Sequence, residues 1–266
     1  MRLFIPTLVS VAAVIGSATV ASADFAAGAR ALKAGNHAAA AKEWAPLADK
    51  GNAAAQLGLA MLYLDGKGVP KDAGKAIEWC RKAAEQGNRD AQMMMGMAYR
   101  QGLGIAADAG QAASWYRKAA EAGSVAAQTS LGFMYAKGEG VGQDFAKARE
   151  WYERAAKQGE VAATYSLGEV YREGWGVPKD PVVAARWYQA AAEKGYAKAQ
   201  TALGSLYVLG NGLPQDFQTA YFWYELAVRR GNVVALKARD ELEPHLTAQQ
   251  LFDARRMARE WKVPKQ

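Results

Sequence analysis

The segment Ser124–Gly159, SVAAQTSLGFMYAKGEGVGQDFAKAREWYERAAKQG, decides the fold because the chain repeats it. In blocks of 36 residues starting at Asn52, five copies align without a gap: 52–87, 88–123, 124–159, 160–195 and 196–231. Several columns of this alignment never change; in the third copy they include Tyr135, Gly138, Gly140, Asp144, Trp151 and Gly159. A fixed period between about 20 and 50 residues predicts a repeat array.

Each copy predicts two helices. In the first copy, an apolar stripe at helical spacing predicts a helix near residues 53–64. Gly66 is suited to end this helix in the left-handed conformation, and Asp72 to cap the start of the second helix. Alternation typical of strands is absent. We therefore expect an all-α, right-handed αα superhelix (solenoid) of five two-helix repeats.

One glycine column falls in the middle of the first helix, where glycine costs about 1 kcal/mol relative to alanine. It comprises Gly96, Gly132, Gly168 and Gly204, with Ala60 in the first copy. A partner helix that crosses at close range, with large Trp and Tyr side chains on either side, would explain it. Helices this short are marginal alone, so their stability must come from stacked neighbours.

The remaining segments predict caps and an export signal. Residues 24–51 read as an N-terminal capping unit and 232–266 as C-terminal capping helices, with a capping box at Thr247–Gln250. Residues 1–23 combine Arg2, an apolar run and the small-residue site Ala21-Ser22-Ala23, which is typical of a signal peptide cut after Ala23. We expect a periplasmic or secreted protein; an uncleaved anchor is the alternative. No cysteine follows the run to carry a lipid.

Composition excludes several function classes. The net charge of +7 is spread along the chain, so it does not predict nucleic-acid binding. One cysteine and two distant histidines exclude a disulfide framework and make a structural zinc site improbable. We expect no cofactor and no metal, and after signal cleavage no integral membrane segment.

The repeated motifs favour architecture over chemistry. The paired glycines, as in Gly138-Glu139-Gly140, lack the Lys-Ser/Thr of a phosphate loop and indicate a turn. The Asp column is explained by helix caps, and the Trp-Tyr pairs by an interhelical core. Cys80 stands where the other copies are aromatic, which predicts a small buried residue; an intermolecular disulfide or redox-sensing thiol is the alternative.

The pattern from Ala127-Gln128 through Leu131-Gly132 and Tyr135 to Trp151-Tyr152 resembles the Sel-one-like repeat family, an α-solenoid relative of the tetratricopeptide repeat. The departures are local: Ala60, Cys80, and Ala163-Thr164 in place of Ala-Gln. The resemblance implies an adaptor that holds proteins together, and exported bacterial relatives regulate sensors, build envelope complexes or engage host proteins. Cysteine-rich relatives are linked to β-lactam binding or hydrolysis, but this chain lacks their paired cysteines and a Ser-x-x-Lys nucleophile in that context.

The positions opposite the buried stripe of each first helix vary between copies, and in related solenoids first helices line the concave surface. We expect these irregular residues to contact a partner peptide or helix, unless they bury against the next repeat. Trp175, between two loop glycines, is a further anchor candidate, unless it lies across a neighbouring loop. The candidate contact residues are Leu57, Met61, Met93, Met97, Arg100, Phe133, Tyr165, Glu169, Arg172 and Trp175.

The sequence therefore predicts a non-enzymatic, exported adaptor or regulator for a protein partner. A cell-envelope scaffold with possible cell-wall association is the alternative, favoured if the region of Trp175 and Tyr165 stacks on sugars. A β-lactam-binding or hydrolysing enzyme is the remote third class.

Overall fold

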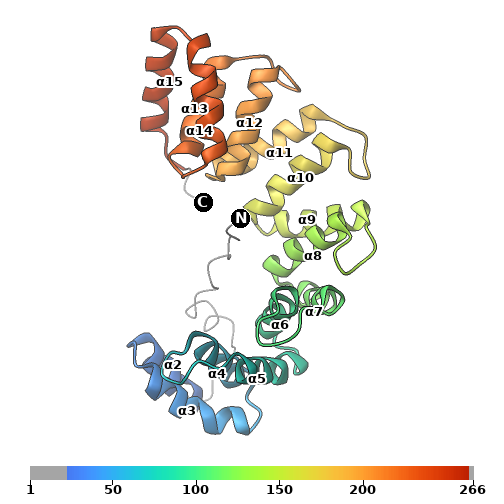
Figure 1. Ribbon diagram of the computed structural model, residues 1–266, viewed down its shortest axis with the longest axis vertical. Helices are drawn as coiled ribbons and strands as arrows, with labels where there is room; N and C mark the ends of the chain where they lie inside the picture. Colours follow the sequence, from blue (N-terminus) through green and yellow to red (C-terminus); the bar gives the residue numbers. More distant parts are fainter. Residues whose placement is uncertain (1–22, 264–266) are drawn as a thin grey trace. The chain divides into compact units, whose positions relative to one another are not determined.

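The computed structural model describes residues 23–263, which contain fourteen α-helices, one short 3₁₀ helix and no strand. The helices are α2 (Ala23–Lys33), α3 (His37–Asp49), α4 (Ala53–Asp65), α5 (Ala73–Glu85), α6 (Arg89–Gln101), α7 (Ala109–Glu121), α8 (Val125–Lys137), α9 (Phe145–Lys157), α10 (Val161–Glu173), α11 (Pro181–Glu193), α12 (Ala197–Leu209), α13 (Phe217–Val228), α14 (Val233–Leu242), η1 (Glu243–His245) and α15 (Ala248–Glu260), as drawn in Figure 1. The expected all-α fold of paired helices is confirmed.

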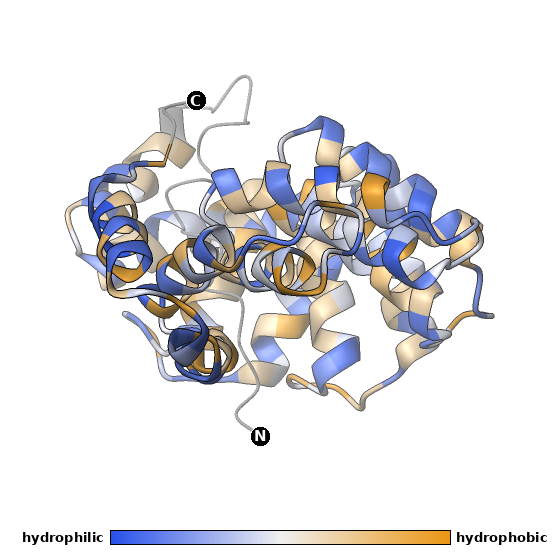
Figure 2. Cartoon of the chain, turned by 90° about the horizontal axis from the view of Figure 1, so that it is seen from above, coloured by the Kyte–Doolittle hydropathy of each residue, from blue (hydrophilic) through white to orange (hydrophobic). Residues whose placement is uncertain are grey.

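The helices alternate between two kinds, which we call first helices (α4, α6, α8, α10, α12) and second helices (α5, α7, α9, α11, α13). Hydrophobic and hydrophilic residues alternate along most of them (Figure 2), as expected for helices that bury one side. The chain divides into two compact units: one runs to Met134 and includes Gly138–Gly142, and the other comprises Tyr135–Lys137 and the chain from Gln143 onward. The two units are described separately.

Each repeat supplies its own helix caps. The aspartates before the second helices, Asp72 among them, accept a hydrogen bond from the backbone N–H three residues later. Asn52, Asn88, Ser124 and Glu160 cap the first helices in a similar way. Each first helix ends at a glycine whose φ lies between 65° and 74°.

The mid-helix glycines make room for a tyrosine ring of the second helix. A Cβ added at Gly96 would lie 2.5 Å from the ring of Tyr116, and one at Gly168 would lie 2.4 Å from the ring of Tyr188. This confirms the close crossing that the glycine column predicts. In the first repeat, Ala60 replaces the glycine and Cys80 replaces the tyrosine, and both lie in one core cluster. Alanine is larger than glycine, and the smaller cysteine side chain in place of tyrosine leaves room for it.

The second glycine of each loop lies against the main chain of the preceding repeat. A Cβ at Gly140 would be 2.1 Å from the carbonyl oxygen of Ala109, the first residue of α7. Gly104 lies in the same way against Ala73, and Gly212 against Pro181. The loops are therefore more than turns, because they join one repeat to the previous one through backbone contact.

The C-terminal cap comprises α14, η1 and α15, which pack on α13. The side chain of Gln250 completes the expected capping box with Thr247. Leu242, Leu246, Ala254 and Ala258 are buried in the same core cluster as α13. The outer face of α15 carries the exposed Arg256 and Arg259 but also the exposed Phe252, so it combines polar and apolar side chains.

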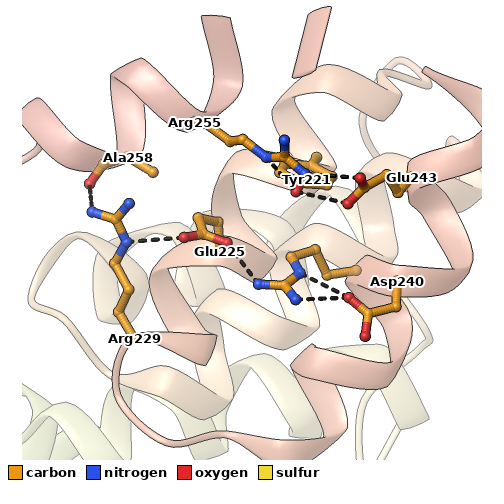
Figure 3. Close-up of polar contacts among 8 residues, drawn as sticks. Tyr221, Glu225, Arg229, Asp240, Glu243, Arg255 and Ala258 are labelled. Carbon is orange, nitrogen blue, oxygen red and sulfur yellow. Dashed lines mark hydrogen bonds and ion pairs between the residues drawn. The ribbon is translucent and has the colours of Figure 1, made fainter. Parts of the chain in front are cut away.

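Two polar networks fasten this cap (Figure 3). Arg255 donates to the Tyr221 hydroxyl at 2.9 Å and to Glu243 at 2.8 Å, and the Tyr221 hydroxyl donates to Glu243 at 3.1 Å. These three residues lie on α15, α13 and η1, so the network joins all three elements.

The second network is centred on Glu225 of α13 (Figure 3). Its carboxylate accepts hydrogen bonds from Arg229 at 3.1 Å and from Arg239 of α14 at 2.9 Å. Arg229 also donates to the carbonyl oxygen of Ala258 in α15 at 2.7 Å. One carboxylate thus connects both capping helices to the last second helix.

The predicted signal peptide falls almost entirely outside the described residues. Within residues 23–263, none of the helices combines the length and apolarity that crossing a membrane would require.

In the N-terminal capping unit, Trp44 of α3 is 2% exposed and stacks on Phe25 of α2 at a ring separation of 5.4 Å.

Candidate functional site

The outward residues of α6 are accessible, as the helical spacing predicts. The buried stripe of α6 includes Met95, which is 0% exposed. Met93, Met97 and Arg100 lie on the opposite side of the helix. Both methionines are half-buried and Arg100 is exposed. We call the outward sides of the first helices, taken within each unit, the first-helix face.

Arg100 connects α6 to the next repeat. Its guanidinium donates two hydrogen bonds to the carboxylate of Glu139, at 2.9 and 3.2 Å. The same guanidinium lies 5.0 Å from the ring centroid of Phe133, which is 38% exposed. Arg100, Phe133 and Glu139 therefore form one continuous surface across two repeats. An acidic ligand would have to compete with Glu139 for the guanidinium.

The prediction that Leu57 lies on this face is wrong. Leu57 is 1% exposed and belongs to a core cluster with Ile77 of α5 and Met95 of α6. The helical spacing places Leu57 opposite the stripe of an isolated α4, but the stacked neighbouring hairpin covers that side. Met61, one turn further along α4, is half-buried and packs at the edge of the same cluster.

In the second unit, the outward residues of α10 form a polar cluster. The carboxylate of Glu169 accepts hydrogen bonds from Arg172, at 3.2 and 2.9 Å, and from the hydroxyl of Tyr188. Arg172 also donates to the Tyr188 hydroxyl at 3.1 Å and pairs with Glu173 at 2.7 Å. Burial acts to raise the pKa of Glu169, but the hydrogen bonds from Arg172 and Tyr188 outweigh it and lower that pKa.

Aromatic rings extend this cluster. The half-buried ring of Tyr165 lies 5.5 Å from the ring of Tyr188 and 5.4 Å from that of Tyr196. Burial raises the pKa of Tyr165, and the nearby carboxylate of Glu169 raises it further. The cluster is a hydrogen-bonded platform in which Tyr165 and Glu169 are half-buried and Arg172 is exposed.

Trp175 lies against a neighbouring element. Its ring stacks on Phe145, the first residue of α9, at a centroid separation of 5.5 Å and an interplanar angle of 13°. The Nζ of Lys137 lies 5.8 Å from the ring centroid. Trp175 is half-buried, and the face against Phe145 is not open to a sugar or a partner.

Several residues of this surface were not among the sequence predictions. Glu139 and Phe145 were missed. Glu139 lies between the two loop glycines, at a position that varies strongly between copies, which is the signal for contacts of this kind; Phe145 lies at the start of α9 instead. Tyr188 belongs to a nearly invariant column and is buried in the core, yet its hydroxyl is hydrogen-bonded to Glu169 and Arg172 of the face. Tyr196 breaks the column of capping residues and makes no side-chain capping bond, a local irregularity that the sequence displays.

The repeated polar columns have a structural role. The Asp column serves as helix caps, as expected. Across residues 23–263, His, Cys, Asp and Glu side chains do not gather in threes where they could hold a metal ion.

Cys80 is buried, as predicted for a small residue at an otherwise aromatic position, and its Sγ lies 3.3 Å from the carbonyl oxygen of Ala91. Burial raises the pKa of this thiol from 9.0 to about 12. We expect the native protein at pH 8 to resist iodoacetamide, and the urea-unfolded protein to react fully, as measured by mass spectrometry.

The raised pKa also sets the direction of a pH effect on stability. Burial likewise raises the pKa values of Tyr116 and Tyr152 from 10.0 to about 12. A group whose pKa is higher when folded stabilises the fold below its unfolded pKa and loses that contribution as pH rises to its folded pKa. Thermal unfolding should therefore show Tm constant from pH 7 to 9 and falling from pH 9 to 12; a Tm that rises over that range contradicts these assignments.

The arrangement of stacked helical pairs with a variable outward face defines an α-solenoid repeat protein. The Sel1 repeat model matches residues 53–88, 89–124, 125–160, 161–196 and 197–232. A Sel1 repeat protein from Oxalobacter formigenes is 37% identical, with a TM-score of 0.76, over 79% of this chain and 87% of that chain. No match was found among curated proteins.

Two other solved structures are similar to this chain at lower sequence identity. A Sel1 repeat protein from Klebsiella pneumoniae subsp. pneumoniae is 25% identical over 76% of this chain and 99% of that chain, with a TM-score of 0.48. The immunity protein Pa5087 from Pseudomonas aeruginosa is 21% identical over 81% and 85%, also with a TM-score of 0.48.

This chain belongs to the Sel1 repeat family. Proteins with these repeats generally mediate protein–protein interactions and are typically non-catalytic.

Proposed function

We propose that this chain is an exported, non-enzymatic adaptor that binds a partner peptide or helix through its first-helix face. The family supports a protein partner. The residues of the face support the location, because they differ between repeats whereas the repeated columns pack between helices, cap helices or form the loops.

The exposure of Phe133 carries the proposal. Phe133 is 38% exposed although the helix around it is buried at Leu131 and Met134, each at 0%. An exposed aromatic ring flanked by Arg100, with the half-buried Met93 and Met97 on the preceding first helix, combines residue types that are enriched at protein interfaces.

Affinity capture tests the location. The wild type and the double variant Met97→Ala/Phe133→Ala are used as baits for the exported fraction of the source cells, and captured proteins are identified and then assayed in purified form. We expect the double variant to lose most of the affinity, because it removes two apolar side chains at the same position of successive repeats without touching an invariant column.

Phe252→Ala is the matched control, because Phe252 is 55% exposed but lies on the capping helix α15. It should bind like the wild type, and all three proteins should show the same circular dichroism. Equal binding by the double variant contradicts the proposed location. Binding of wall material in place of a protein favours the envelope scaffold.

Export is tested separately. The pattern of residues 1–23 supports a cleavable signal, so the mature protein should begin at Asp24 and be found outside the cytoplasm. Mass spectrometry of the protein from separated cell fractions identifies its N-terminal residue and the fraction in which it is found. An intact N-terminus in the cytoplasm contradicts export and leaves the binding test unaffected.

A further inference from the structure

Helix α14 lies where the spacing of the repeats would place a sixth first helix. Asn232 caps α14 through the backbone N–H of Ala235, as Asn52 caps α4 through that of Ala55. α14 packs on α13 as α12 packs on α11. In a repeat, the next helix is a second helix that packs on the first, as α13 does on α12, whereas α15 packs on α13. α14 is thus a first helix without the usual second helix.

The side of α14 that a second helix would cover is open. In the repeats, this side carries the mid-helix glycine, which lies against the second helix. The residue one turn before the glycine position is buried in every copy; these residues are Gln56, Gln92, Gln128, Thr164 and Gln200. In α14 the two equivalent residues are Asp240, whose side chain is 57% exposed, and Leu236, which is 40% exposed. Val233, one turn before Leu236 on the same side, is 75% exposed.

Asp240 explains why this side is left open. At Gly168, the ring of Tyr188 lies where a Cβ would be, so a second helix can cross this closely only where the first helix has a very small residue. Asp240 places a carboxylate at this position, held by hydrogen bonds from Arg239 at 3.0 and 2.7 Å (Figure 3). The usual close crossing is therefore blocked, and the aliphatic side chains beside Asp240 stay exposed.

The distribution of exposed apolar side chains favours a second copy of α14 as the cover. Val233, Val234 and Leu236 are 75%, 66% and 40% exposed, and no other helix within residues 23–263 exposes three large hydrophobic side chains. The N-terminal capping unit exposes none between residues 23 and 51. An end-to-end contact between two copies would therefore lack an apolar counterpart, which α14 of the second copy supplies.

The charges on the same side of α14 determine the direction of such a contact. Lys237 follows the aliphatic residues, and Asp240 and Glu241 come one turn later. Two α14 helices that cross antiparallel near Leu236 bring Lys237 of each copy within reach of Asp240 of the other. They also oppose the two helix dipoles. A parallel crossing would instead place like charges side by side.

We propose that this chain forms a symmetric, antiparallel dimer through α14, in which Val233 and Leu236 of the two copies pack on one another. A contact that uses the same patch on both copies closes on itself and gives a dimer rather than a filament. One short helix per copy buries less than the roughly 1,200–2,000 Å² of a stable interface, so the dimer should dissociate on dilution. The proposal goes beyond partner binding, because α14 is not one of the first helices that form the first-helix face.

Sedimentation equilibrium of the purified chain over a wide range of protein concentration tests the dimer. We expect the mass of the wild type to rise from that of the monomer towards twice that value, and Leu236→Asp to stay monomeric throughout. Leu209→Asp is the matched control, because Leu209 is 70% exposed but lies at the end of α12. It should dimerise like the wild type, and circular dichroism should be the same for all three proteins.

Charge reversal tests the antiparallel direction. Lys237→Glu and Asp240→Lys should each weaken self-association, because each places two like charges together across the contact. An equimolar mixture of the two variants should dimerise again, since Glu at position 237 then meets Lys at position 240, and the native Lys237 meets the native Asp240.

Three results would overturn the proposal. They are a wild type that is monomeric at every concentration, a folded Leu236→Asp variant that dimerises like the wild type, and a mixture of charge variants that associates no better than either alone. Each leaves the binding of a partner to the first-helix face unaffected, because that binding is measured with Met97→Ala/Phe133→Ala.

Discussion

Substitution of Gly140 by alanine should reduce the free energy of unfolding by about 3–5 kcal/mol, one of the two largest effects we expect from a single change. Two causes add. The residue has φ of +68°, where an L-residue is strained by about 1–2 kcal/mol. The new Cβ would also lie 2.1 Å from the carbonyl oxygen of Ala109, and a backbone atom cannot move aside as a side chain can.

Gly123→Ala separates these causes. Gly123 has φ of +88° but no atom within 4 Å of an added Cβ, so it should lose only about 1–2 kcal/mol. Urea unfolding followed by circular dichroism measures both variants, and hydrogen exchange shows whether protection falls at α7 and α8 in particular. Equal losses would mean that the loop makes no close contact with the preceding repeat.

Substitution of Glu225 by alanine should reduce the free energy of unfolding by about 2–3 kcal/mol, less than for a fully buried pair because its partners are partly exposed. The side chain of Glu225 is 15% exposed and that of Arg239 is 20% exposed. The substitution leaves Arg239 without its acceptor in α13, and Arg229 keeps only the carbonyl of Ala258. Hydrogen exchange should show α14 and α15 opening first.

The control is Glu241→Ala, which removes another carboxylate of the same cap. Glu241 pairs with Lys237 at 3.7 Å, and their side chains are 68% and 81% exposed, so the change should stay within about 0.5 kcal/mol. If both variants unfold alike, the Glu225 network does not hold the cap. Glu225→Gln should fall between them, since its amide oxygen retains one acceptor for an arginine.

The sequence alone predicts the architecture well because each repeated column has a local cause. Asp72 and Gly66 specify a helix start and a helix end through their own backbone preferences, and five repetitions of each leave few alternatives. The capping box at Thr247 is equally local. These features need no knowledge of the neighbouring repeat.

The candidate site is harder to predict because it depends on how repeats stack. Helical spacing places Leu57 outward on α4, yet the next hairpin covers it. The pair of Arg100 and Glu139 joins residues 39 apart, and becomes evident only when a loop is known to lie over the preceding first helix. Tyr188 belongs to a core column and is fully buried, and no spacing rule indicates that its hydroxyl bonds to Glu169 and Arg172 of the first-helix face.

The contact between each loop and the main chain of the preceding repeat has a consequence for how such a chain can evolve. This contact is made by a glycine and main-chain atoms, so it does not depend on the side chain between the two loop glycines. The residues at that position are Lys67, Leu103, Glu139, Trp175 and Asn211. Recombination can therefore duplicate, delete or exchange whole copies in steps of 36 residues without mismatched joints. Because the contact does not depend on it, the residue between the two loop glycines is free to be selected for binding a partner.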